Sequence, residues 1–99
     1  DEEEELVDLG DGQYLVEGSM KLDDLNDILD LELSSEDYDS VGGLVIDRLE
    51  HLPSQGEEVM CGNVRLVVEQ VEKNRIDKVH LYVLPEEKEE NIEGRRNSS

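Results

Sequence analysis

The feature that most restricts the fold is an alternation of apolar and polar residues over residues 76–84. The apolar positions are Val79, Leu81 and Val83, and the residues between and before them are Lys78, His80 and Tyr82. Successive side chains of a β-strand point to opposite faces of a sheet. The alternation therefore predicts a strand with one face in the core and the other in water.

A second long strand is predicted over residues 64–72. The apolar residues at positions 64, 66 and 68 share one face, but Val71 falls on the other. A β-bulge adds one residue to a strand and so reverses the alternation beyond it. A bulge near Glu69-Gln70 would return Val71 to the buried face, and a turn over residues 73–75 would join the two strands as a hairpin.

Two helices and two further strands are predicted before this hairpin. Apolar residues at helical spacing begin at Leu22, and Ser40 is a suitable N-cap for the second helix. The predicted elements are a strand over 13–18, a helix over 22–29, a helix over 41–50 and a short strand over 58–61. The order β-α-α-β-β-β predicts an α+β domain, with two helices on one side of a small, mainly antiparallel sheet.

Composition limits the class of protein. A chain of 99 residues supports one domain, and without Phe or Trp its core must be aliphatic. With 28 acidic residues against nine Lys and Arg, the net charge is −19. Nucleic acid is excluded as an expected partner, because neutralising phosphates takes a basic patch. The single Cys61 cannot form an intrachain disulfide.

The charge divides the chain into segments. Residues 21–50 hold ten acidic residues against Lys21 and Arg48, whereas residues 64–84 hold three acidic residues against four basic ones. Like-charged runs bury too little apolar surface to offset the entropy of ordering. We therefore expect an acidic linker over 1–10, a domain over 11–84, and a disordered acidic and polar tail over 85–99.

Gly42-Gly43 permits two interpretations. Glycines before a helix can cradle a phosphate, usually with a Lys that reaches it. No Lys follows here, and acidic residues such as Asp39 surround the pair. Since Gly within a helix costs roughly 1 kcal/mol relative to Ala, we expect the pair to be retained for close packing against another backbone.

Some acidic residues lie at spacings that could serve a hard cation such as Mg²⁺. The weak candidates are Asp23, Asp27 and Asp30 on one helical face, and Asp37 with Asp39 as a second pair. No calcium-loop pattern is present, and exposed carboxylates usually form a solvated face. Counter-ion accumulation is expected here in preference to a specific metal site.

The solvated face of the last two strands lies in the part of the domain that is not strongly acidic. Its candidate interaction residues are Arg65, Lys78, His80 and Tyr82. One interpretation is an ordinary solvent face. The other is a docking surface for a second copy, for neighbouring domains or for an anionic small molecule.

Three blocks of sequence resemble one known family. They are "DGQYLVEGSMKLDDLNDIL", "EDYDSVGGLVIDRLEHLPSQGEEV" and "RIDKVHLYVL". Their order and spacing are similar to those of the CorC/HlyC transporter-associated domain over residues 11–84. One departure is Lys21, where the family often has a small capping residue, so the start of the first helix is the boundary it affects.

The resemblance implies a setting. Such domains form the cytoplasmic C-terminus of bacterial membrane proteins, after an integral-membrane region, a pair of CBS domains and an acidic linker. The parents are labelled magnesium and cobalt efflux proteins or hemolysin-like proteins. The fold is similar to the FAD-binding domain of the p-cresol methylhydroxylase type, and the family has no established catalytic residues.

From the resemblance we expect a non-enzymatic module that modulates divalent cation transport from the cytoplasmic side of the membrane. Its expected partners are the CBS domains and membrane region of the same parent, with a homodimer as a further arrangement. No cofactor is required, although weak binding of a divalent cation or adenine nucleotide is compatible. The alternatives are an adenine-nucleotide or flavin sensor and a dimerisation module.

Overall fold

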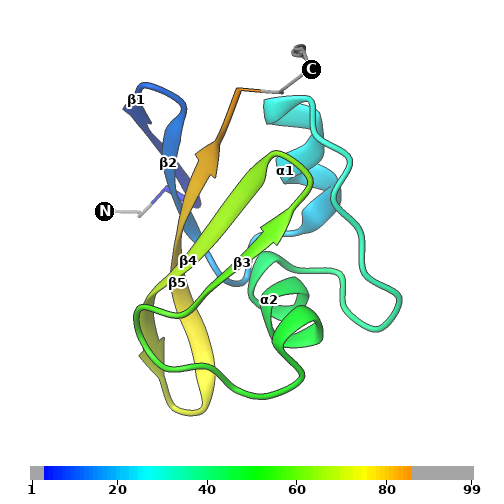
Figure 1. Ribbon diagram of the computed structural model, residues 1–99, viewed down its shortest axis with the longest axis vertical. Coiled ribbons are helices and arrows are strands. Elements are labelled where there is room, and N and C mark those ends of the chain that lie inside the picture. The colour runs from blue at the N-terminus through cyan, green and yellow to red at the C-terminus, as the bar shows by residue number, and fades with distance from the viewer. Residues whose placement is uncertain (1–3, 86–99) are drawn as a thin grey trace, which may run out of the picture.

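The computed structural model describes residues 4–85, which form one five-stranded sheet with two helices against it (Figure 1). All strand pairs are antiparallel, and the order across the sheet is β1-β2-β5-β4-β3. The elements are β1 (Leu6–Gly10), β2 (Gln13–Glu17), α1 (Leu22–Leu29), α2 (Val41–Leu49), β3 (Glu58–Cys61), β4 (Val64–Glu72) and β5 (Arg75–Val83).

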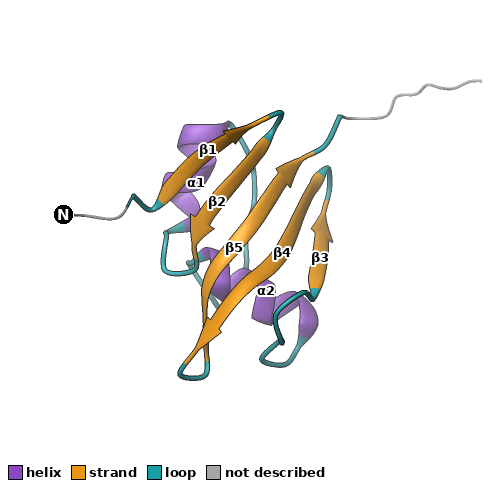
Figure 2. Cartoon of the chain, turned by 90° about the vertical axis from the view of Figure 1, so that its left-hand side faces the viewer, coloured by secondary structure: helices purple, strands orange, loops and turns teal. Residues whose placement is uncertain are grey.

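Both helices lie behind the sheet in Figure 2, and the other face of the sheet has no covering element among residues 4–85. This arrangement confirms the predicted α+β class with helices on one side. None of the helices in this described part of the chain is long and apolar enough to cross a bilayer.

The predicted element order was wrong in one respect, because it omitted β1. Leu6–Gly10 lies within the range expected to be a linker, but it pairs with β2 through a two-residue turn, Asp11-Gly12. Both turn residues have positive φ, 56° and 75°, as the turns that suit a twisted hairpin require. The Asp-Gly dipeptide was the available signal. The tail predicted over 85–99 lies, from residue 86 onward, outside the described residues.

The predicted hairpin of β4 and β5 is confirmed. Its turn is Lys73-Asn74, with φ of 53° and 65° at the two residues. The register shifts between Val68 and Gln70, where the bulge was expected, and Val71 packs against the core. The bulge keeps Val71 on the same face as the buried residues at positions 64, 66 and 68 despite the break in their alternation.

The core lies between the sheet and the helices and is wholly aliphatic apart from one methionine. No polar or charged residue of the described chain is buried. The side chains that are almost fully enclosed are Val16, Met20, Leu25, Val41, Leu44, Val45, Val64, Leu66, Val68, Val79 and Leu81. Burying each such side chain stabilises the fold by about 1.5–3 kcal/mol before entropy is counted.

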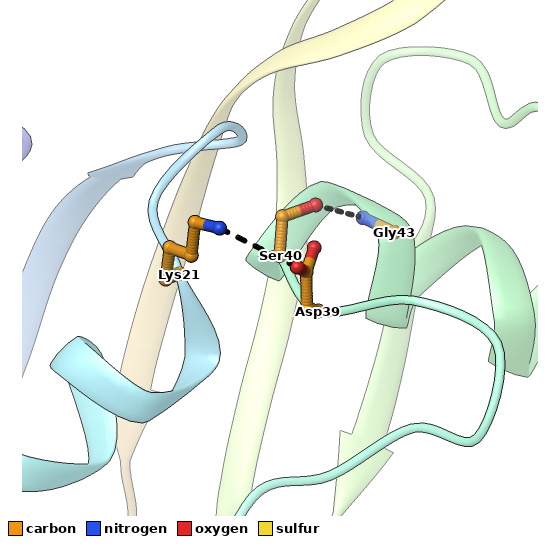
Figure 3. Close-up of polar contacts among 4 residues, drawn as sticks. All are labelled: Lys21, Asp39, Ser40 and Gly43. Carbon is orange, nitrogen blue, oxygen red and sulfur yellow. Dashed lines mark hydrogen bonds and ion pairs between the residues drawn. The ribbon is translucent and has the colours of Figure 1, made fainter.

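Helix α1 begins at Leu22 although Lys21 provides no capping side chain. The backbone provides the partner, because the Leu22 amide donates to the Asp39 carbonyl at 2.8 Å. The Lys21 ammonium also lies 3.5 Å from the Asp39 carboxylate (Figure 3). The departure at Lys21 is therefore accommodated by the segment that leads into α2.

Helix α2 approaches the sheet most closely at two glycines. The Gly42 amide donates to the Gly18 carbonyl at 2.8 Å, and the Gly18 amide donates to Asp77 on β5 at 2.9 Å. A Cβ on Gly42 would lie 3.1 Å from the Gly18 oxygen, and a Cβ on Gly18 would overlap the carbonyl oxygen of Ile76. Gly18 is therefore in direct contact with the backbone of both α2 and β5.

We predict that Gly18→Ala destabilises the domain by about 1–3 kcal/mol, because the added methyl group overlaps a backbone oxygen that cannot rotate away. Urea unfolding followed by circular dichroism measures the change. Ser19→Ala, at the exposed neighbouring position, is the matched control and should be near neutral. Equal stabilities of Gly18→Ala and the native chain would contradict the close approach.

Candidate functional site

The start of α2 is the first candidate site, and its amide groups already have partners. Val41 donates to the Met20 carbonyl at 2.9 Å, Gly42 donates to Gly18, and Gly43 donates to the Ser40 hydroxyl at 3.2 Å (Figure 3). An anion at a helix start needs these amides free. The glycine pair therefore serves packing, as expected, and the arrangement does not favour a nucleotide site.

The space around Gly43 leads to the same conclusion. A Cβ at Gly43 would lie 2.5 Å from Cβ of Tyr38, so the side chain of the preceding loop occupies that space. The adjacent hollow, of about 440 Å³, is lined by Glu17 and Asp77 as well as by Arg75. The acidic lining offers a phosphate no net attraction.

The candidate metal ligands do not converge. Within residues 4–85, no three His, Cys, Asp or Glu side chains are placed to hold one ion together. Asp39 pairs with Lys21, and Asp30 occupies the left-handed position that ends α1, with φ of 59°. The acidic residues at 23, 27, 30, 37 and 39 are arranged as a solvated charged surface on the helix side.

A groove of about 690 Å³ lies between the loop that follows α1 and the β3–β4 turn. Leu31 and Leu33 line one side, Met60 and Cys61 line the other, and Arg48 of α2 contributes the cation. Cys61 is a half-buried free thiol. Burial raises its pKa above the ordinary value, while the charge of Arg48 acts weakly in the other direction. This thiol is a packing group and a poor nucleophile.

The uncovered face of the sheet is the remaining candidate, and it brings together all four residues predicted to lie there. Three of the four, His80, Tyr82 and Arg65, form one stack of two rings and a guanidinium. The rings of His80 and Tyr82 are parallel within 7° at 4.4 Å, and the Arg65 guanidinium lies 5.6 Å from the centre of the Tyr82 ring. His80 also lies 3.1 Å from the Gln13 side-chain oxygen on β2.

The two cations of this face, Arg65 and Lys78, each have an acidic neighbour on the same face. Arg65 lies 3.3 Å from Glu58 on β3, and Lys78 lies 3.6 Å from Glu17 on β2. His80 approaches Glu69 at 3.9 Å. The face is therefore close to neutral, whereas the helix side carries most of the acidic residues of the domain.

The register also places three aliphatic residues in one row across this face, which the sequence interpretation missed. Val7, Leu15, His80, Val67 and Glu58 stand opposite one another in turn across the five strands. The neighbouring row on this face runs through Tyr82 and Arg65 to Met60. The exposed fraction of Met60 is 53%. In β2 three consecutive apolar residues, Tyr14, Leu15 and Val16, give no alternation that marks Leu15 as the outward one. Val7 could not be placed without recognising β1.

We predict that Cys61 reacts with a disulfide reagent at pH 8 more slowly in the folded chain than in urea, because its raised pKa leaves less thiolate. The midpoint of the pH–rate profile should also lie higher in the folded chain, which burial of an unshifted thiol would not produce. Arg48→Gln should raise that midpoint further, and Lys21→Gln is the control. Identical midpoints in the folded and unfolded chains would contradict the assignment.

Comparison with known proteins places this fold in a family. The chain is 34% identical over 90 residues to a UPF0053 protein of Synechocystis sp., covering 87% of this chain and 20% of the relative. It is 29% identical to the magnesium and cobalt efflux protein CorC of Salmonella typhimurium, covering 71% of this chain and 24% of the relative. The chain thus spans about a fifth to a quarter of the length of these relatives.

A solved structure of similar size supports the same assignment. It is the transporter-associated domain from a Xylella fastidiosa hemolysin, described in complex with Mg²⁺ and Mn²⁺. The TM-score is 0.74 at 26% identity, and the match covers 83% of this chain and 100% of the other. Residues 7–85 match the transporter-associated domain model CorC_HlyC, so the chain belongs to that family.

Proposed function

We propose that this domain is a non-catalytic regulatory module on the cytoplasmic side of a bacterial membrane protein, where it modulates divalent cation transport. A relative is named a magnesium and cobalt efflux protein, which supports Mg²⁺ and Co²⁺ as the transported ions. The limited share of each relative that the chain covers supports a longer parent. The membrane region and CBS domains of that parent are the proposed partners.

The observation that carries the proposal is the uncovered sheet face with its paired charges. An antiparallel sheet can leave one face in water, but here Val7, Leu15 and Val67 cross that face in one row. Docking through this face would hold neighbouring domains in one arrangement. The acidic helix side would then face outward, away from the docked domains.

We predict that deleting residues 6–84 from the parent changes its transport of Mg²⁺ or Co²⁺, and that Arg65→Glu with Lys78→Glu changes it in the same direction. The double reversal places like charges beside Glu58 and Glu17 and so disrupts the docking face. Ion flux into or out of vesicles that contain the purified parent measures the effect.

The matched control is Lys21→Glu with Arg48→Glu, which changes the net charge equally on the helix side. Both cations are exposed, so their loss should cost at most about 1 kcal/mol. This control should leave transport near that of the native parent. Transport that is indifferent both to the deletion and to the sheet-face reversal would contradict the proposed function.

A further inference from the structure

We propose that the uncovered sheet face binds the same face of a second copy of this chain, forming a two-fold dimer. The inference rests on the docking surface of the proposed function and names its partner. The sheet face comprises the outward-facing residues of the five strands, Val7, Gln13, Leu15, Glu17, Glu58, Met60, Arg65, Val67, Glu69, Lys78, His80 and Tyr82.

The distribution of charge over the domain favours contact through the sheet face. The net charge of −19 opposes association of two copies in most orientations. Residues 21–50, which include both helices, hold ten acidic and two basic residues, so contact through the helix side brings like charges together. On the sheet face Arg65, Lys78 and His80 each have an acidic neighbour. Sheet-to-sheet contact is therefore the arrangement that keeps the two acidic sides farthest apart.

The sheet face is also complementary to itself. In a two-fold dimer the same patch meets its own copy, so it must present both donors and acceptors. Arg65 with Glu58 forms one pair, and Lys78 with Glu17 forms another across different strands. Each pair can face a pair of the other copy with opposite charges opposed. A strongly basic or strongly acidic patch could not do this.

Contact between two sheet faces would also bury aliphatic side chains. Val7, Leu15 and Val67 lie in one row across four neighbouring strands, with the ring of His80 between the last two. Val7 has an exposed fraction of 37%, and Met60 one of 53%. Two sheets pack face to face at about 10 Å through such side chains. The paired charges would then form the rim around an apolar centre.

Sedimentation equilibrium of the 99-residue chain tests the dimer. Relatives of similar length were solved as separate domains, which supports using the chain alone. We expect concentration-dependent dimers that become tighter between about 0.05 and 0.5 M NaCl, because salt screens the net repulsion. Arg65→Glu with Lys78→Glu should weaken the dimer roughly tenfold or more. Lys21→Glu with Arg48→Glu, which makes the same change in net charge, should not.

A charge-swapped variant separates the interface from a loss of folding. Arg65→Glu, Glu58→Arg, Lys78→Glu and Glu17→Lys together keep every pair on the sheet face and its neutrality. This variant should dimerise again. A native chain that stays monomeric at high concentration and high salt would overturn the dimer, as would equal weakening by the helix-side control.

The dimer and the proposed function can fail separately. If the native chain is monomeric while transport by the parent still responds to the sheet-face reversal, the partner is another domain and the dimer is wrong. If dimers form with the predicted pattern while the parent transports normally without residues 6–84, the dimer stands and the regulatory role is wrong.

Discussion

The close approach of α2 to the backbone of the sheet is the contact on which the rest of the structure depends. Gly42 reaches the Gly18 carbonyl, and Gly18 in turn is bonded to Asp77 on β5. A Cβ at Gly18 would overlap the Ile76 carbonyl oxygen, and a Cβ at Gly42 would lie only 3.1 Å from the Gly18 oxygen. The contact seats the aliphatic face of α2 on the sheet, and it satisfies the amides with which a helix start could otherwise hold an anion. The Gly42-Gly43 pair therefore serves packing of the helix and not the binding of a phosphate.

With both helices fixed on one side, the charges of the domain are separated in space. The acidic residues gather on and between the helices, where Asp39 and its neighbours meet water. The opposite face of the sheet carries cations paired with acids, a stacked pair of rings and a row of aliphatic side chains. Self-repulsion favours contact through that face and disfavours contact elsewhere. The proposed regulatory role requires such a bias, because the domain would have to meet its partner in one orientation.

Much of this fold could be predicted from local patterns. The alternation in β5, the bulge that restores Val71 to the core and the capping of α2 by Ser40 each depend on a few adjacent residues. The first strand was missed because its acidic surroundings suggested a linker, although the Asp11-Gly12 turn that joins it to β2 was a local signal. The candidate site combines local alternation with pairing between strands that are distant in the sequence. The residues Arg65, Lys78, His80 and Tyr82 were placed correctly on one face by alternation, whereas the aliphatic row between them emerged only when five strands were set side by side.

The account has one central claim, that the sheet face is the working surface and the helix side is not. Two tyrosines allow it to be tested within a single molecule, since Tyr82 lies on the sheet face and Tyr38 is exposed beside α2. Hydroxyl-radical footprinting with mass spectrometry would compare their modification in the dilute isolated chain and in the assembled parent protein. The account predicts that assembly protects Tyr82 and leaves Tyr38 as reactive as before. Equal modification of Tyr82 in the two samples, or protection of Tyr38 alone, would contradict it.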